Sequence, residues 1–400
     1  MQCRLKVALV SDFCYPFAKG GVETRYYILA KYLISQGHCV TWFTSRQWDG
    51  APEQLVEGIR IRCIIERINA FNGSRRSIKG ALQFGGAALG LVLMREQFDV
   101  VDMSQYPFFH LLAGKLYIVL RRTPVVVSWY EFWDNHWLEY LGKNKGKIGR
   151  LVERWAARLA SNIIVISQQS SRQLLAIGCD PASTYYVPNW IDYEHIVRLV
   201  PIGSPYEVCY FGRLKDHKNV DVLLKALALC RNEGLVLGTK ILGDGPERQN
   251  LEKLAQELQV GPQVNFLGRI EHYDDLLGYV KSAQLFVNPS TKEGGGSITC
   301  LEANACGVPT IAVRHPLGLD ENLILEGQNG QWIREATPRA IADKLHEYFK
   351  SDVKHRQEMS RRTIEWARQY SVESLCRQIE KIYLNLANLK TRSKENNHHG

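Results

Sequence analysis

Three segments of the chain place glycine beside charged side chains in a pattern that favours binding of a phosphorylated ligand. Glycine lets the backbone approach a ligand closely, and cationic side chains stabilise phosphate charge. The segments are Gly20–Glu23, Phe211–Asn219 and Pro289–Gly307.

Gly20 and Gly21 stand at the start of an expected helix that follows the first expected strand. A helix N-terminus offers unpaired N–H groups and the positive end of the helix dipole, which suits a phosphate. Two glycines alone are equally typical of a plain tight turn. The pair is therefore a candidate phosphate contact with an open alternative.

The segment Phe211–Asn219 joins an expected strand to an expected helix in the second half of the chain. Gly212 leaves space there, Arg213 supplies a planar fork, and Lys218 supplies a point charge. Together they predict a clamp on a diphosphate. A solvated basic loop is the alternative, but ligands of α/β sheets gather after such strands.

Glu293 and Glu302 flank a glycine-rich loop that leads into an expected helix. Three consecutive glycines lose much backbone entropy on ordering, which suggests a ligand contact. Glu302 lies one turn into the helix and could bind two adjacent hydroxyls, as on a ribose, whereas Glu293 could hold hydroxyls of a sugar. The alternative for Glu302 is an ordinary surface carboxylate. The residues of the loop that could contact a sugar or phosphate are Gly294, Gly295, Gly296, Ser297 and Ile298.

A fourth segment, Ser128–Trp133, lies at the carboxyl end of an expected strand and is rich in aromatic residues. Tyr130 could hydrogen-bond a sugar, and Glu131 could bind its hydroxyls. By composition, core aromatics are the better interpretation of this segment.

The elements that position these residues alternate between apolar strand-like runs and helix-like runs, twice over. Among them we expect strands at Cys39–Ser45 and Thr310–Val313 and helices at Ile78–Gln97 and Ile298–Ala305. Continuous apolar strands are typical of a parallel sheet covered by helices on both faces. We therefore expect an α/β fold of two facing doubly wound, Rossmann-like domains with C-terminal helices. The expected domains are residues 1–190, residues 191–370, and residues 371–400 as a C-terminal helix plus a polar tail. We expect that tail to be disordered from Lys390.

The net charge, the cysteines and the absence of certain sequence motifs limit the partners and the cellular compartment that we expect. The chain has 400 residues and a net charge of +9, all of it in residues 1–190. Such an asymmetry favours an anionic partner for the first half, although charge for solubility alone is an open alternative. No helix-turn-helix, zinc-finger or RNA-binding aromatic motif is present, so nucleic acid is not expected as a partner. The ten cysteines are scattered, several within apolar strands such as Cys39, Cys63 and Cys209, which is typical of a reducing cytosol. We therefore expect a cytoplasmic protein, without a signal peptide or a metal-ligand spacing.

These motifs, in this order, resemble the retaining, nucleotide-sugar-dependent glycosyltransferases of family four, whose fold is called GT-B. The similarity extends over roughly residues 4 to 385. The matching pieces are Gly20–Glu23, Gly37–Val40, Val187–Asn189, Gly212-Arg213, Lys218-Asn219, Gly243–Pro246, Glu293, Glu302-Ala303, Cys306–Pro309, Gly318, Glu321, Glu326-Gly327 and Asn329-Gly330.

The resemblance implies that residues 1–190 hold the acceptor, that residues 191–370 hold the nucleotide sugar, and that the C-terminal helix packs back on the first domain. It also implies roles for residues that match the family's motifs. Arg213 and Lys218 would hold the diphosphate, assisted by the N–H of Gly21, and Glu293 would hold the transferred sugar. The loop Gly294–Ile298 would cradle sugar and phosphate, Glu302 would bind the ribose, and the base would rest on the backbone of Arg269 and Ile270. Members use a UDP- or GDP-linked donor, need no cofactor or metal, and close a cleft during transfer.

Two positions depart from the family's pattern. Glu293 and Glu302 are separated by one residue more than is usual, an insertion that the triple glycine could absorb as a bulge. Tyr130 stands where many members have histidine, and a phenol is a poor proton carrier at neutral pH. Two other functions stay open: a non-catalytic nucleotide-sugar-binding protein, and a glycan hydrolase that uses Glu293 and Glu302 as its carboxylate pair.

The acceptor is expected on the basic first domain. Arg75, Arg76 and Lys79 precede an apolar stretch, and a second basic group lies between Lys143 and Arg158. Basic residues beside apolar surface can bind anionic lipid. A glycan or lipid-linked acceptor and peripheral attachment to the cytosolic membrane face are the corresponding predictions, with a soluble acceptor as the alternative.

Overall fold

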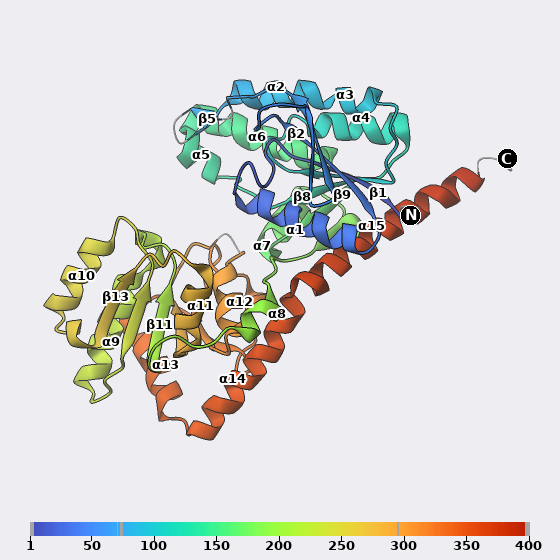
Figure 1. The fold of residues 1–400 in the computed structure, drawn as a ribbon. Helices are drawn as coiled ribbons and strands as arrows, with labels where there is room; N and C mark the ends of the chain where they lie inside the picture. Colours follow the sequence, from blue (N-terminus) through green and yellow to red (C-terminus); the bar gives the residue numbers. More distant parts are fainter. Residues whose placement is uncertain (1–3, 70, 73–74, 294–295, 397–400) are drawn as a thin grey trace. The chain divides into compact units, whose positions relative to one another are not determined.

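The computed structural model describes residues 4–69, 71–72, 75–293 and 296–396, and it forms two compact units (Figure 1). Unit 1 comprises Met1–Ile166, Ser170–Val187 and Cys376–Gly400. Unit 2 comprises Ser167–Gln169 and Pro188–Leu375. Each unit is built around its own largely parallel sheet.

The sheet of unit 1 has eight strands in the order β10-β9-β8-β7-β1-β2-β4-β3, and all neighbours are parallel except β3 and β4. Its central strands are buried along their length, as their continuous apolar runs predict. The strands are β1 Lys6–Val10, β2 Cys39–Ser45, β3 Glu53–Val56, β4 Ile59–Ile65, β7 Val100–Ser104, β8 Val125–Trp129, β9 Asn162–Val165 and β10 Thr184–Tyr186. A separate hairpin pairs β5 Phe71–Asn72 with β6 Arg75–Arg76.

Helices cover both faces of this sheet (Figure 1). On one face α4 contacts α2, α3 and α6, and α6 also packs on α5. Helices α1 and α15 lie together on the other face, joined by a hydrogen bond between Tyr32 and Glu380. The bounds are α1 Gly21–Ser35, α2 Ile78–Ala88, α3 Gly90–Leu93, α4 Leu111–Arg121, α5 His136–Leu141, α6 Lys143–Leu159, α7 Gln168–Ala176 and α15 Val372–Asn396.

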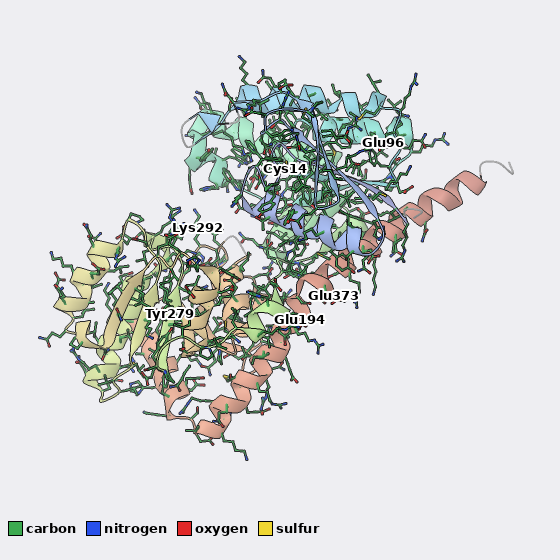
Figure 2. The ribbon with its side chains drawn as sticks, viewed as in Figure 1. Cys14, Glu96, Glu194, Tyr279, Lys292 and Glu373 are labelled. Carbon is green, nitrogen blue, oxygen red and sulfur yellow. The ribbon has the colours of Figure 1, made fainter. Side chains whose placement is uncertain are left out.

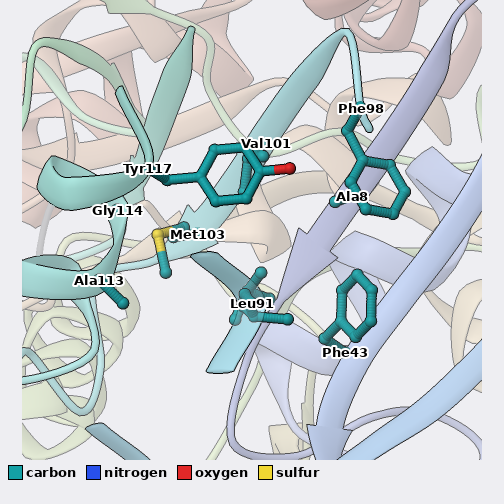
Figure 3. A pocket seen from close by; sticks show the side chains of 10 residues that line it. Ala8, Phe43, Leu91, Phe98, Val101, Met103, Ala113, Gly114 and Tyr117 are labelled. Carbon is teal, nitrogen blue, oxygen red and sulfur yellow. The ribbon is translucent and has the colours of Figure 1, made fainter. Parts of the chain in front are cut away.

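A small apolar cavity lies between the sheet and the inward sides of α3 and α4 (Figure 3). Met103 and Phe98 line it from the sheet side, and Leu91, Gly114 and Tyr117 line it from the helices. A Cβ added at Gly114 would lie 2.6 Å from the Met103 sulfur, so glycine allows the close approach of α4 here. With an almost wholly hydrocarbon lining, the cavity is a packing gap in the core of unit 1.

A buried carboxylate joins the C-terminal helix to this core. Asp102 of β7 accepts hydrogen bonds from the hydroxyls of Tyr26 on α1 at 2.6 Å, Ser128 on β8 at 2.9 Å, and Tyr383 on α15. Burial raises the pKa of Asp102 to about 6, although the three hydroxyl donors lower it. The Asp102 carboxylate thus joins β7 to three elements that are distant from one another in sequence, α1, β8 and α15.

The sheet of unit 2 has six parallel strands in the order β13-β12-β11-β14-β15-β16. Helix α9 packs with α10 and α13, and α12 packs with α8, α11 and α14. The strands are β11 Tyr206–Phe211, β12 Thr239–Leu242, β13 Val264–Gly268, β14 Ala283–Asn288, β15 Thr310–Val313 and β16 Gly330–Ile333. The helices are α8 Tyr193–Arg198, α9 Val220–Asn232, α10 Arg248–Glu257, α11 Tyr273–Lys281, α12 Ile298–Ala305, α13 Pro338–Lys350 and α14 Val353–Ala367. Short 3-10 turns are η1 Pro181–Ser183, η2 Asp216–Lys218, η3 Gly261–Gln263, η4 Glu321–Leu323 and η5 Arg368–Tyr370.

The direction of chain progression reverses once in each sheet. In unit 2 the chain runs outward from β11 to β12 on one side and from β14 to β15 on the other. In unit 1 it reverses between β1 and β7. Loops that follow the two strands at such a point diverge and leave a crevice where ligands of α/β sheets bind.

The loops after β11 and β12 pack backbone against backbone. Leu214 donates its N–H to the Asp244 carbonyl at 3.0 Å, and Gly212 donates to the Leu242 carbonyl at 3.0 Å. A Cβ added at Gly243 would lie 1.9 Å from the Gly212 oxygen, and the φ of Gly243 is +140°. Glycine is therefore required at this contact.

Three sequence expectations differ from the structure. The stretch expected as one helix over 78–97 divides into α2 and α3 at Leu89, between residues 86 and 90, which are glycines. The final helix continues to Asn396, past the Lys390 at which we expected a disordered tail. Cys39, expected as a buried thiol, is exposed and disulfide-bonded, whereas Cys209 is buried and free as expected.

The raised pKa of Asp102 predicts a pH-dependent stability. Its carboxyl binds a proton more tightly in the folded state (pKa about 6) than at the ordinary value of 3.8. The buried charge therefore costs no free energy of unfolding below about pH 4, where the carboxyl is protonated. The cost grows as pH rises and reaches about 3 kcal/mol above about pH 6. Asp102→Asn removes this titration. Urea unfolding between pH 4 and 7 should show stability falling with pH more in the wild-type protein than in the variant, and equal slopes would contradict the assignment.

The glycine contact between the loops predicts an asymmetry between two substitutions. Gly243→Ala should destabilise the protein by about 2 kcal/mol or more, because its Cβ meets backbone and its φ is unfavourable for alanine. Gly261→Ala is the matched control, since no heavy atom lies within 4 Å of its added Cβ, and it should change stability by no more than about 0.5 kcal/mol. Chemical unfolding of both variants measures the difference, and similar stabilities would refute the close contact.

Candidate functional site

The strongest candidate site lies in unit 2, on the loops that follow β11 and β14, the two strands between which the direction of chain progression reverses. These loops contain Lys218 and Glu293, which approach within 2.7 Å (Nζ to Oε1). Their side chains are 20% and 8% exposed, so the ion pair is largely shielded from water. Two side chains predicted to be catalytic from separate motifs therefore meet at the reversal point of the sheet.

Hydrogen bonds from neighbouring residues hold both loops in place. Thr291 donates its backbone N–H to the His217 carbonyl at 3.2 Å, and Glu293 donates its own to the Leu317 carbonyl at 2.8 Å. Asn219, in the left-handed region with φ of 53°, donates from its amide to the Pro289 carbonyl at 3.0 Å. The Lys218–Glu293 pair thus rests on a fixed backbone, although the two residues are 75 positions apart.

The start of α12 follows the same loop. Ser297 is the N-cap residue and is buried, whereas Ile298 is exposed at the first helical position. The carbonyl of Gly296 accepts a hydrogen bond from the Asn189 amide at 3.0 Å, which ties the loop to the segment before α8. Gly294 and Gly295 lie outside the described residues.

Glu302 lies inside α12 and is buried. Its Oε1 accepts a hydrogen bond from the Tyr273 hydroxyl of α11 at 2.6 Å. Burial raises the pKa of Glu302, while this hydrogen bond lowers it. Since Glu302 is not a free surface carboxylate, the alternative of an ordinary surface residue does not describe it.

The remaining predicted residues of unit 2 lie on the loops around this pair. Gly212 follows β11 with a φ of +147°, and the side chain of Arg213 next to it is exposed. Arg269 and Ile270 follow β13, and the Arg269 guanidinium pairs with Glu271 at 3.3 Å. Lys292, exposed and labelled in Figure 2, adds a further positive charge to the loop after β14.

In unit 1, Gly20 and Gly21 begin α1 as expected, but their surroundings differ. A Cβ at Gly20 would lie 2.2 Å from the carboxylate of buried Glu23, whereas a Cβ at Gly21 would have no heavy atom within 4 Å. Gly20 is thus enclosed by its own helix, and Gly21 has open space beside it.

The structure places Tyr130 and Glu131 differently from each other. The Tyr130 hydroxyl is buried with no hydrogen-bond partner among the described residues, and burial raises its pKa. A phenol in that state does not exchange protons at neutral pH. Glu131 is exposed, and its carboxylate accepts from the Trp133 indole at 2.7 Å. The Gln105 amide fixes this turn through hydrogen bonds to the backbone of both residues.

Two further groups that shape the same edge of unit 1 were not among the residues predicted from the sequence. Asp12, after β1, is buried and paired with Arg76, which also lies over the Tyr106 ring at 5.4 Å. Glu153 of α6 accepts the backbone N–H groups of Trp133 and Asp134, each at 2.9 Å, and burial raises its pKa to about 7. A signal for Glu153 exists in the sequence, because it is the lone acid of a strongly basic helix.

Within the part of the chain that the structure describes, no group of three or more His, Cys, Asp or Glu side chains could hold a metal ion. Charged groups at the unit 2 site include the Lys218–Glu293 pair, Glu302, Arg213, Lys292 and Arg269. Their chemistry is that of recognising phosphate and hydroxyl groups.

Sequence comparisons with known proteins also indicate a protein that handles sugars. Two protein-family sequence models match the chain. The family described as "Glycosyl transferases group 1" matches residues 194–366, and the family described as "Glycosyltransferase Family 4" matches residues 19–195. The chain is 24% identical over 333 residues to an alpha-monoglucosyldiacylglycerol synthase of Streptococcus pneumoniae, covering 78% of this chain and 72% of that one. It is also 24% identical to one component of the human phosphatidylinositol N-acetylglucosaminyltransferase, covering 81% of this chain and 66% of that one.

Solved structures show the same fold. Sucrose-phosphate synthase from Thermosynechococcus elongatus superposes with a TM-score of 0.70 at 18% identity, over 96% of this chain and 99% of that one. HepE of Anabaena, solved in complex with UDP, superposes with a TM-score of 0.71 at 18% identity, over 95% of this chain and 100% of that one. The two Rossmann-like units are those of the GT-B fold. The chain belongs to the family 4 (group 1) glycosyltransferases and is an enzyme of that kind.

Proposed function

We propose that this glycosyltransferase moves a hexose from a UDP- or GDP-linked donor to a glycan or lipid-linked acceptor, with retention of anomeric configuration. The observation that carries the proposal is the shielded Lys218–Glu293 pair, 2.7 Å apart, at the reversal point of the unit 2 sheet. A cation for the diphosphate and a carboxylate for the sugar hydroxyls lie side by side there, as transfer from a nucleotide sugar requires.

The diphosphate would bind against Lys218 and Arg213. Negative charge develops on the β-phosphate as the sugar leaves, and fixed positive groups lower the barrier to that step. Lys218 is fixed by its hydrogen bond to Glu293, and Arg213 is exposed with no ion pair among residues of the described ranges. The N–H groups at the start of α12 would add to the same stabilisation.

The nucleoside would extend toward β13. Glu302, held at 2.6 Å by Tyr273, would accept hydrogen bonds from the ribose hydroxyls. The base would lie on the backbone of Arg269 and Ile270, and Gly296, Ser297 and Ile298 would line the sugar and phosphate. HepE of Anabaena was solved in complex with UDP and in complex with UDP-glucose, which supports a nucleotide-sugar donor for this chain.

The transfer itself needs no protein nucleophile. The bond from the sugar C1 to the β-phosphate oxygen breaks, and the acceptor oxygen forms a bond to C1 on the same face. The acceptor's proton passes to the leaving phosphate. Glu293, already paired with a cation, would orient sugar hydroxyls, and the buried hydroxyl of Tyr130 would take no part in the proton transfer.

The two alternatives account for fewer observations. A hydrolase needs two carboxylates on either side of one bond, but Glu293 pairs with Lys218 and Glu302 with Tyr273. A non-catalytic binding protein would hold a diphosphate with the same Arg213 and Lys218, so it is membership of a glycosyltransferase family that disfavours it.

For the acceptor, two relatives carry names that specify lipids, a glucosyldiacylglycerol and a phosphatidylinositol. The net charge of +9 resides in residues 1–190, so an anionic surface would attract this half of the chain. We therefore assign the acceptor to unit 1, at the edge where Arg76 and Glu131 lie. In this proposal the enzyme acts at the cytosolic face of a membrane and uses neither a metal nor a cofactor.

Lys218→Ala tests the diphosphate role. Removing one charge-stabilising donor should lower kcat on the order of 100-fold. Lys215→Ala, an exposed neighbour on the same loop, is the matched control and should retain nearly full turnover. Release of UDP or GDP from a panel of hexose donors, with and without acceptor, measures the effect. Turnover of Lys218→Ala within a few-fold of wild type would overturn the assignment.

Gly21→Ala tests the open space beside the start of α1. The added methyl has no neighbour within 4 Å, so stability should change by no more than about 0.5 kcal/mol. If the donor phosphate approaches this N–H, the methyl should lower kcat/KM for the donor by roughly tenfold. Gly261→Ala, also without a neighbour, is the control. Unchanged kcat/KM in a stable Gly21→Ala protein would exclude a phosphate contact here.

A further inference from the structure

Large apolar side chains are exposed on the layer of helices that covers one face of the unit 1 sheet. Most exposed apolar residues elsewhere in the described chain are scattered singly, as is normal for a soluble surface. On α2, α3, α4 and α6 they instead follow the helical repeat. We call the outward side of these four helices the apolar face.

Helix α4 shows the pattern most clearly. Its inward residues Leu111, Gly114 and Tyr117 are buried against the sheet. On the outward side, apolar residues recur at spacings of three or four, and Leu120 is 64% exposed. The outward apolar residues are Leu112, Leu116, Val119 and Leu120. A helix that is apolar on both sides needs a second apolar environment.

The neighbouring helices repeat the arrangement. Along α2 and α3 the exposed residues are Ile78, Leu82, Leu89 and Leu93, of which Leu93 is 82% exposed. Along α6 they are Ile148, Leu151 and Trp155, with Leu151 68% exposed. Because α4 contacts α2, α3 and α6, the three rows lie on adjacent helices of one layer (Figure 1).

The charge of this layer is almost entirely positive. Helices α2, α3, α4 and α6 contain nine Lys and Arg residues and one acid, Glu153, which is buried. Basic residues adjoin the apolar rows: Lys79 follows Ile78, Lys115 precedes Leu116, and Lys147 precedes Ile148. All three lysines are exposed.

We propose that the apolar face docks on the surface of an anionic lipid bilayer. Apolar side chains would enter the headgroup region while adjoining lysines and arginines contact lipid phosphates. A second copy of the chain fits less well, because it would bring nine further positive charges against the first nine. No helix within the described ranges is long and apolar enough to cross a bilayer, and docking on the surface needs none.

This inference deepens the proposed function, on which it rests for its purpose: a lipid-linked acceptor would be met at the surface where unit 1 docks. The physical claim can be tested without transfer chemistry. The vesicle flotation assay includes neither donor nor acceptor, so a lack of vesicle binding would leave the proposed sugar transfer intact. Conversely, a lack of sugar transfer in an activity assay would leave the vesicle-binding result valid.

The experiment is flotation of the full chain with vesicles of phosphatidylcholine alone or mixed with phosphatidylserine. Binding to the mixed vesicles, weakened by high salt, is expected. The double variant Leu120→Glu with Leu151→Glu should bind at least roughly tenfold more weakly. Val236→Glu with Leu325→Glu is the matched control in unit 2, where both residues are exposed, and should bind like wild type.

Three results would overturn the proposal. The first is no salt-sensitive binding of wild type to mixed vesicles, and the second is equal loss in the control. The third is a dimer in sedimentation velocity that Leu120→Glu with Leu151→Glu dissociates, which would assign the apolar face to a second copy. Circular dichroism and UDP-induced thermal stabilisation of each variant establish that both units remain folded.

Discussion

The backbone contact between the loops after β11 and β12 is the constraint on which the donor-side site depends. A side chain at Gly243 would overlap the Gly212 carbonyl, because an added Cβ would lie 1.9 Å from the Gly212 oxygen. That contact fixes the first residues after β11, and Asn219 fixes the last by its hydrogen bond to Pro289. Lys218 lies between these two fixed points, so its direction toward Glu293 follows from backbone packing more than from its own charge.

Unit 1 is held together by a different device. Asp102 accepts from hydroxyls on α1, β8 and α15, which makes the C-terminal helix part of the core formed by the first third of the chain. His38 and Tyr32 repeat the attachment one turn away, at 3.0 and 3.1 Å from the Glu380 carboxylate. Buried polar contacts of this kind demand their partners, because an unpaired carboxylate in such a place is costly.

Much of the fold could be predicted because the parallel strands are continuous apolar runs. β2, β15 and α12 begin and end where the pattern places them, whereas short edge strands such as β3 and β10 escape prediction because they bury little. At the site, the types of Lys218, Glu293 and Glu302 were evident from the sequence. Their partners were not, since contacts over 75 and 29 positions are set by sheet topology. Basic residues beside apolar ones pointed to lipid binding at α2 and α6, but the part of the apolar face on α4 was not predicted. When a helix such as α4 is apolar on two sides, its sequence does not say which side is buried.

The distribution of charge now has a structural meaning. The excess of +9 lies in residues 1–190, and nine basic residues of that part belong to the four helices of the apolar face. Unit 2, counted over Ser167–Gln169 and Pro188–Leu375, contains 22 Lys and Arg and 25 Asp and Glu, so it has no positive excess. Unit 2 therefore offers a diphosphate no strong long-range field and must recognise it through local groups. Glu293 neutralises Lys218 at 2.7 Å. An arriving diphosphate would compete with Glu293 for that cation, and a carboxylate released from an ion pair is better able to accept hydrogen bonds from a sugar. Binding of the phosphates would thus prepare the carboxylate that holds the sugar, which couples recognition of the two ends of the donor at a single pair of side chains.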